Sequence, residues 1–413
     1  MLWRCVQYLL PVVVTAALIL LSPPPPKSEI CVMVRNSAGP LTVVMNCDSH
    51  LFVRLAREPG RFFTNEGNVL QSRPLFLALG WAFALPLRAL DRILVWAGAD
   101  SAQRPDPFYF GYIALNALLL ALLLAMFIRL LGSGSIAEWA LVLPVAVLLI
   151  NNVTKAFFWT PHLQILSMLT PLLAVALSMW LHTRSATLSL RRITFLGFAI
   201  GLAGLAYGAF LVVVAAGVVT LLLDGRRALS QRAAKAFVLA ASFASPIIAW
   251  VAFVTATYGS FYNHEVGLYR QFVWILDAAP RGIQPFASEV VQKLDEFGST
   301  FPSAVAFPGA LLVVALIVAR LLRIPVVTPD NRELVRAIAI YTAVAIPFYW
   351  LMGFYETRLT WVLVPPMLLV LAAAMRKLDS RLAAQSRIIF RLTTASIALA
   401  YVIHTLSKYG PYS

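Results

Sequence analysis

The chain has 413 residues, of which 60% are hydrophobic and only 12% charged, and its mean hydropathy is +0.81. These values exclude an ordinary soluble domain and predict a polytopic membrane protein. The formal net charge is +15, but Lys and Arg fall in short gaps between apolar runs. This placement is typical of loops that orient a membrane protein and attract anionic headgroups, so it predicts membrane lipids as partners and argues against nucleic acid. No shift in composition marks a second domain, so residues 1–413 are interpreted as one integral membrane domain.

The apolar runs predict an all-α fold with about 11 transmembrane helices. The first run, Trp3 to Leu21, has a basic flank and is followed by "SPPPPKSE" in place of a small-residue cleavage site, so we expect a signal anchor that stays in the protein. With the basic gaps inside, the N-terminus is cytoplasmic and the C-terminus lies outside. The expected spans are residues 3–21, 108–131, 136–152, 163–181, 193–206, 208–223, 234–257, 307–323, 336–352, 358–374 and 389–406.

One further apolar segment, residues 73–99, is interrupted by Pro86, Arg88, Asp91 and Arg92. If it crossed the membrane, the basic "HTRSATLSLRR" cluster would be exported, against the positive-inside rule. We therefore expect it to lie along the outer interface, and "GLAGLAYGAFL" to be a turn between two short helices. The outer face then receives residues 22–107 (the first extracytoplasmic loop), 151–162, 257–304 (the long loop) and 353–361.

The three cysteines agree with this sidedness. Cys5 lies in the first span, whereas Cys31 and Cys47 bracket "VMVRNSAGPLTVVMN", in which two β-branched runs flank a turn-forming "NSAGP". The pattern predicts a small β-hairpin whose ends bring the two sulfurs within bridging distance. A disulfide would contribute about 3 kcal/mol in the chain-entropy model and needs an oxidising compartment such as the periplasm. The alternative is two free cysteines.

A short amphipathic helix is predicted directly after Cys47. It starts near Asp48 and ends at Pro59-Gly60, and on the outer membrane surface its apolar face would be formed by Leu51, Phe52, Leu55 and Ala56. Aspartate is a preferred N-cap because its carboxylate accepts from the first free amides of a helix. Asp48 therefore has a structural interpretation of its own.

The order of these features resembles the GT-C superfamily of membrane glycosyltransferases. The carrying motifs are an aspartate outside the first span, an "RLA" helix, "LQSRPLF", the Gly-rich "GLAGLAYGAFLVVVAAGVVTLLLDGRR", and a late "FYETRLTWVLVPPMLLV". The resemblance covers most of the chain in architecture, although each motif is short. Two departures are the lack of an adjacent acidic pair in the first loop, which leaves a divalent metal open, and the lack of an additional C-terminal domain, which favours a lipid-linked or polysaccharide acceptor.

The resemblance implies an integral protein of the bacterial inner membrane that acts on its extracytoplasmic side. The donor would be a polyprenyl-phosphate sugar, the acceptor a glycan or glycolipid, and Asp48 the general base of an inverting transfer. Such chemistry needs a carboxylate near the attacking hydroxyl and cations near the departing phosphate. The cationic candidates are Lys155, His162, Arg358 and Arg73. Each has the alternative role of an interfacial side chain that reaches toward headgroups, and Glu356 is either a second acid or the partner of Arg358.

Other residues and functions stay open at this stage. The long loop carries aromatic and charged side chains that suit an acceptor but also anchor loops at an interface: His264, Glu265, Tyr269, Arg270, Trp274 and Arg281. No zinc spacing, P-loop or dinucleotide fingerprint indicates a cofactor. The alternative functions are a polymerase or ligase of lipid-linked polysaccharide and, with less support, a transporter, which would place ionisable residues at mid-membrane and show internal repeats.

Overall fold

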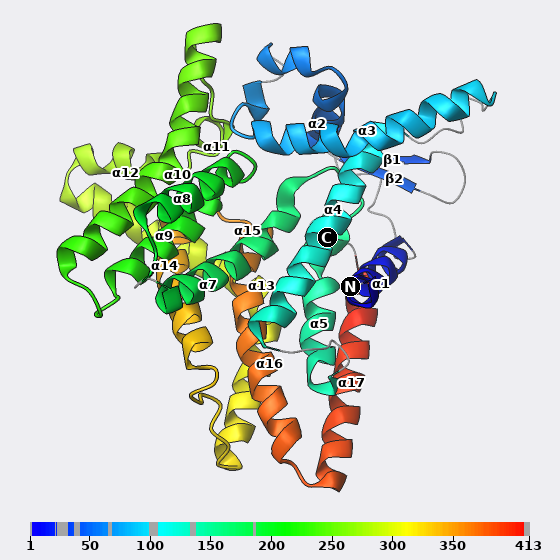
Figure 1. Ribbon diagram of the computed structural model, residues 1–413, viewed down its shortest axis with the longest axis vertical. Helices are drawn as coiled ribbons and strands as arrows, with labels where there is room; N and C mark the ends of the chain where they lie inside the picture. Colours follow the sequence, from blue (N-terminus) through cyan, green and yellow to red (C-terminus); the bar gives the residue numbers. More distant parts are fainter. Residues whose placement is uncertain are drawn as a thin grey trace.

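The computed structural model describes residues 2–20, 22, 32–36, 42–64, 68–98, 106–132, 138–184 and 187–408. In these ranges the chain is helical apart from one pair of short strands (Figure 1). The elements are α1 (Leu2–Leu20), β1 (Val32–Asn36), β2 (Thr42–Asn46), α2 (Cys47–Arg57), η1 (Pro59–Phe63), η2 (Asn68–Leu70), α3 (Pro74–Trp96), α4 (Pro107–Leu130), η4 (Trp139–Leu141), α5 (Val142–Leu149), α6 (Asn152–Phe157), η5 (Leu163–Ile165), α7 (Leu166–Arg184), α8 (Leu190–Gly204), α9 (Phe210–Leu222), α10 (Leu229–Tyr258), α11 (His264–Gly267), α12 (Val273–Ala278), η6 (Ala279–Arg281), α13 (Ile283–Leu321), α14 (Arg332–Met352), α15 (Thr357–Thr360), η7 (Trp361–Leu363), α16 (Val364–Arg381) and α17 (Ala384–Ser407).

Eight helical segments among the described residues are long and apolar enough to cross a membrane, which is consistent with the predicted polytopic membrane protein. The expected count of 11 is not confirmed, because seven of the expected spans are among these eight segments and the eighth is Pro74–Trp96. The expected spans at 136–152, 193–206 and 208–223 form helices of only 8, 15 and 13 residues. Even 15 helical residues rise only about 22 Å, less than the roughly 30 Å of a hydrocarbon core.

Two segments differ in extent from their sequence interpretation. The second half of the expected long loop 257–304 is helical, because α13 begins at Ile283 and continues for 39 residues into the apolar span. Within the apolar segment 73–99, residues Pro74–Trp96 form one continuous helix, α3, despite the internal Pro86. By length and hydropathy α3 also qualifies as a span, and Figure 1 shows it at a steep angle to α4, α16 and α17. Its expected place along the interface stays a prediction.

The Gly-rich turn is where the sequence places it. Helix α8 ends at Gly204 and α9 begins at Phe210. Helix α8 lies against α10 through Gly197 and Gly201, where an added Cβ would stand 2.6 Å and 2.2 Å from backbone oxygens of α10. Small residues spaced by four allow such close contact between helix backbones. The close crossing fixes the α8–α9 turn over α10.

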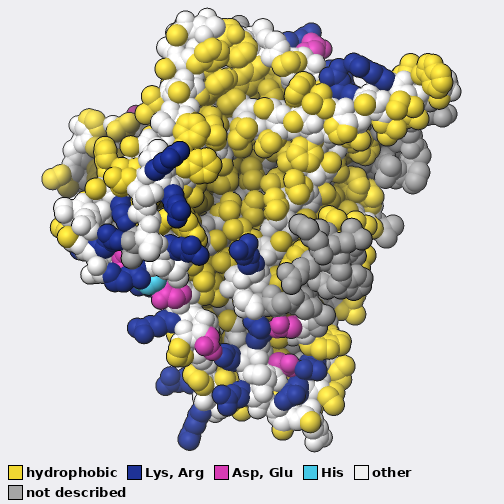
Figure 2. All heavy atoms as spheres, in the orientation of Figure 1, with side chains coloured by type: hydrophobic (Ala, Val, Ile, Leu, Met, Phe, Trp, Pro, Cys, Tyr) yellow, Lys and Arg dark blue, Asp and Glu magenta, His cyan; other side chains and the backbone are white. Residues whose placement is uncertain are grey.

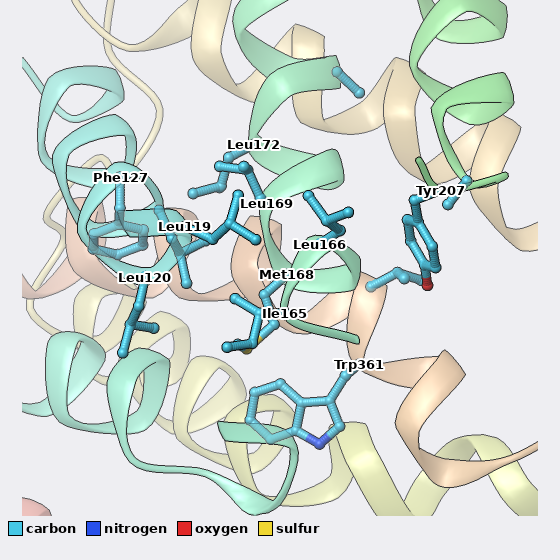
Figure 3. Close-up of a cluster of buried hydrophobic side chains, with 14 of the residues drawn as sticks. Leu119, Leu120, Phe127, Ile165, Leu166, Met168, Leu169, Leu172, Tyr207 and Trp361 are labelled. Atoms are coloured by element: carbon cyan, nitrogen blue, oxygen red, sulfur yellow. The ribbon is translucent and has the colours of Figure 1, made fainter. Parts of the chain in front are cut away.

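Helix α7 forms the centre of the apolar core (Figure 3). Its side chains meet those of α4 on one side, and they approach the α8–α9 turn and η7 on the other. The side chains labelled in Figure 3 are all buried, so dispersion contacts among closely packed side chains stabilise this core. The side chains labelled in Figure 3 are Leu119, Leu120, Phe127, Ile165, Leu166, Met168, Leu169, Leu172, Tyr207 and Trp361.

The first loop contains the two strands and α2. Strands β1 and β2 pair antiparallel, with Val32 opposite Asn46 and Asn36 opposite Thr42. Cys31 lies outside the described residues, so the disulfide stays a prediction. Helix α2 ends just before Pro59, as the sequence predicts, and the buried residues of its apolar face include Phe52, Leu55 and Ala56.

Basic side chains gather where α4, α7, α9 and α16 end and where α10, α14 and α17 begin, a region termed the basic end. Figure 2 shows Lys and Arg mainly along the left edge and in the lower third of the view, around a broad apolar surface. Two arginines connect these termini through His182. Arg226 donates to the backbone carbonyl of His182, and a guanidinium nitrogen of Arg336 lies 3.1 Å from Nε2 of the His182 ring. The Lys and Arg residues that the sequence places between apolar runs thus lie together at one end of the helices in the folded chain.

Candidate functional site

A cavity of about 450 Å³ lies at the opposite ends of these helices. It is formed by the residues before α3 and α7, the α8–α9 turn, α10, residues 261–272 and the segment from α14 to α15. Three of the four predicted phosphate-binding residues, Arg73, His162 and Arg358, line it. These residues are far apart in the sequence, so the fold brings them together.

Arg73 is held at the cavity by an acid from the long loop. It stands directly before α3, whose first residue is Pro74, and its guanidinium forms an ion pair with Glu265. Glu265 also accepts a hydrogen bond from the Ser72 hydroxyl at 3.0 Å. Only about a fifth of each charged side chain is exposed, which weakens solvent screening of the pair. Glu265 therefore joins the first loop to the long loop at the cavity.

Arg358 has a nearby acid of its own. Its guanidinium pairs with Glu356, two residues earlier, and lies 5.9 Å from the ring centre of Phe157. The backbone carbonyl of Arg358 accepts from the Gln164 side chain at 3.3 Å. Glu356 is absent from the residues that line the cavity. Of its two sequence interpretations, the structure places it as the partner of Arg358.

His162 is buried beside the two arginines. Its Nδ1 accepts from the backbone N–H of Gln164 at 3.1 Å. Because a backbone N–H can only donate, the proton of the neutral imidazole lies on Nε2. The ring centre is 4.5 Å from that of Phe157 and 6.4 Å from that of Phe52. Aromatic side chains thus fix the plane of the imidazole from two directions.

A buried asparagine fixes the chain just before His162. The side-chain amide of Asn116, on α4, lies within 3.0 to 3.1 Å of the carbonyl oxygens of Phe157, Phe158 and Thr160. These carbonyls lie where α6 ends, and of the three the Phe157 carbonyl also accepts from the backbone N–H of Thr160 at 3.4 Å. The Asn116 side chain thus supplies hydrogen bonds that the backbone would make if the helix continued. Sequence reasoning missed Asn116, because a single polar residue in an apolar helix does not reveal its partners.

Tyr207 adds a neutral hydroxyl to the cavity. It lies in the α8–α9 turn and forms hydrogen bonds with Gln164 and Ser167. Burial raises the pKa of Tyr207 to about 12, against the opposing effect of the positive charges of Arg73 and Arg358. The phenol stays protonated at neutral pH and can donate to an anion.

Lys155 lies elsewhere. Its ammonium donates to the carbonyl oxygens of Thr405 and Leu406, at 3.1 and 3.0 Å, near the end of α17. Burial lowers the pKa of this lysine to about 8. Lys155 is not among the residues that line the cavity, so the structure does not bring it to Arg73, His162 and Arg358.

Asp48 is the second residue of α2, and its carboxylate lies outside what the structure describes. The helix itself is next to the site, because Phe52, one turn after Asp48, forms the edge contact with the His162 ring. The backbone at Asp48 therefore begins the turn of α2 that leads to a cavity-lining histidine.

Apolar side chains form most of the remaining wall. They come mainly from the turn before α9, from α10 and from α14, and they include Leu205, Phe243, Ile247, Trp250 and Phe348. A cavity with guanidinium groups at one part and apolar walls elsewhere suits a molecule with an anionic head and a hydrocarbon chain. Among the described residues, no group of three or more His, Cys, Asp and Glu side chains is placed to hold a metal ion.

Comparison of the chain with protein-family models, with curated proteins and with solved structures found no match.

Proposed function

We propose that this protein is an inverting glycosyltransferase that moves a sugar from a polyprenyl-phosphate donor to a lipid-linked or polysaccharide acceptor. Its site would lie on the extracytoplasmic face of a bacterial inner membrane. The proposal is supported chiefly by the cavity in which Arg73, His162 and Arg358 meet an apolar wall. A lipid phosphate requires both surfaces in one place, because its head is an anion and its tail is hydrocarbon.

Each group has a defined task in such a reaction. The acceptor hydroxyl attacks the anomeric carbon as the bond to the donor phosphate breaks, and Asp48 takes the hydroxyl proton as general base. Negative charge then grows on the leaving phosphate, where Arg73 and Arg358 would stabilise it. His162 and Tyr207 would donate neutral hydrogen bonds to phosphate or sugar oxygens.

The test is sugar transfer by the purified protein in detergent. The donors are synthetic polyprenyl-phosphate hexoses, N-acetylhexosamines and pentoses, and the readout is release of polyprenyl phosphate with formation of a glycosylated product. Asp48→Asn should lower turnover by a factor of 100 or more, since a positioned general base contributes roughly that much. His50→Ala is the matched control, because His50 lies two residues away on the same helix and is exposed.

Two results would count against the proposal in different ways. Absence of transfer from every donor by the wild-type protein would refute the glycosyltransferase activity. Undiminished turnover in Asp48→Asn, with an active wild type, would refute only the assigned base. A selective loss in Arg73→Gln and Arg358→Gln, seen as a higher KM for the donor, would support the phosphate-binding role.

A further inference from the structure

A second cavity, of about 610 Å³, lies at the basic end of the molecule. It is lined by residues at the end of α4, in η4, in the turn before α14, at the end of α16 and at the start of α17. Part of its wall is apolar, with Leu334 and Ala373 from the helices and Trp139 from η4. Trp139 is about half exposed, and tryptophan at such a position is typical of the membrane–water interface. The cavity thus has an apolar side and an interfacial aromatic side chain.

Three cationic side chains from α16 and α17 line the polar side, together with the carboxylates of Glu138, Asp330 and Asp379. Two are fixed by acids. Arg376 has its Nε 2.7 Å from a Glu138 carboxylate oxygen and donates to the Leu131 carbonyl at 2.7 Å. Arg391 makes two bonds of 2.8 Å to Asp379. These pairs leave about a third of each arginine side chain exposed.

Lys377 is different. Its nearest carboxylate, on Asp330, is 3.9 Å away and belongs to a side chain that is 87% exposed. Within the part of the chain that the structure describes, its ammonium makes no hydrogen bond. An ammonium has three donors, so Lys377 faces the cavity with hydrogen-bonding capacity that the fold does not use.

We infer that this cavity binds the phosphodiester headgroup of an anionic membrane lipid. Lys377 would donate to the phosphate oxygens, and the exposed edges of the ion-paired Arg376 and Arg391 would offer further N–H donors. The apolar wall and Trp139 favour a lipid over free phosphate, because they would contact the glycerol and the first acyl carbons. The site lies at the far end of the molecule from Arg73 and Arg358, and it does not depend on the proposed transfer reaction.

The experiment measures binding of phosphatidylglycerol to the detergent-purified full-length chain by native mass spectrometry. Lys377→Gln should weaken phosphatidylglycerol binding about tenfold, which is the scale of one charge-assisted hydrogen bond. Arg192→Gln, which removes the same charge from an exposed position of α8 at the same end, should leave binding unchanged. Lys377→Arg keeps the charge and should retain most of the affinity, so it controls for misfolding of the glutamine variant.

Two further arms identify the ligand. Phosphatidylcholine, which has no net charge, should bind much more weakly than phosphatidylglycerol. Inorganic phosphate should neither bind measurably nor compete at millimolar concentration. Equal loss of phosphatidylglycerol in Lys377→Gln and Arg192→Gln would overturn the site, since binding would then follow total charge. Inorganic phosphate that competes with the lipid would overturn its assignment to a lipid.

Discussion

The contact between α8 and α10 at Gly201 predicts a strong effect from one methyl group. In Gly201→Ala the new Cβ would stand 2.2 Å from the carbonyl oxygen of Phe243 and 2.7 Å from Pro246. Carbon and carbonyl oxygen normally approach to about 3.3–3.6 Å, so the two helices must separate by about 1 Å. Overpacking costs typically 1–3 kcal/mol, and we expect the upper part of that range because the nearest atom belongs to the backbone.

The assay is the free energy of unfolding in mixed detergent micelles, followed by circular dichroism. The control is Gly298→Ala in α13, where an added Cβ meets nothing within 4 Å. Alanine there should be neutral or stabilising by up to about 1 kcal/mol, because alanine favours a helix over glycine. Because Phe243 lines the cavity, Gly201→Ala should also raise the donor KM. Equal stability of the Gly201 and Gly298 variants would refute the close crossing.

Three other substitutions have definite expected outcomes. Lys155→Met should destabilise the protein by about 1–3 kcal/mol, because it leaves the carbonyls at the end of α17 without a donor. Burial lowers the pKa of Lys155 from 10.5 to about 8 in the folded protein, so the unfolded chain binds more protons between these two pH values. The free energy of unfolding should therefore rise from pH 8 to 10.5 in the wild type and not in Lys155→Met. Asn116→Leu should lower the thermal midpoint by leaving the buried carbonyls of Phe158 and Thr160 without the amide donor, each at a cost of about 1 kcal/mol or more. Glu265→Gln should lower transfer at low donor concentration about tenfold by removing the charge that holds Arg73, and Glu265→Asp should partly restore it.

Each outcome has a counterpart that would contradict its reasoning. The same rise in stability with pH in Lys155→Met would assign the titration to another group. An unchanged midpoint in Asn116→Leu would mean that solvent satisfies the carbonyls of Phe158 and Thr160. Donor kinetics in Glu265→Gln that match the wild type would show that Arg73 keeps its position without the ion pair.

Features that depend on neighbouring residues could be predicted from the sequence. The apolar spacing of α2 and the Pro59 that follows it predict both the helix and its end, and the glycines before Phe210 predict the α8–α9 turn. The extension of α13 was missed because charges such as Lys293 and Glu296 made the segment resemble a loop. Its helical spacing of apolar residues, Phe286, Val290, Leu294, Phe297 and Phe301, was present all the same.

Features that depend on tertiary contacts could not be predicted. The sequence separates Arg73 from Glu265 by 192 residues, and no local pattern selects Glu265 from the charged and aromatic residues of its loop. Tertiary contacts also explain why the expectation for Lys155 was not met. Its position in an outer loop suggests a phosphate ligand, whereas its partners are set by the docking of α17.

The separation of these partners also determines when the site can exist during synthesis. The side chain of Gln164 donates to the backbone carbonyl of Arg358, 194 residues later. Arg73 can form its ion pair only after Glu265 has been synthesised. Helices of a membrane protein are made and inserted in chain order, so α2, α3 and α7 are in place long before their cavity can close. A nascent chain released before residue 358 would carry the early half of the site exposed to lipid. Completion of α15 is therefore the step that turns an inserted bundle into a closed site.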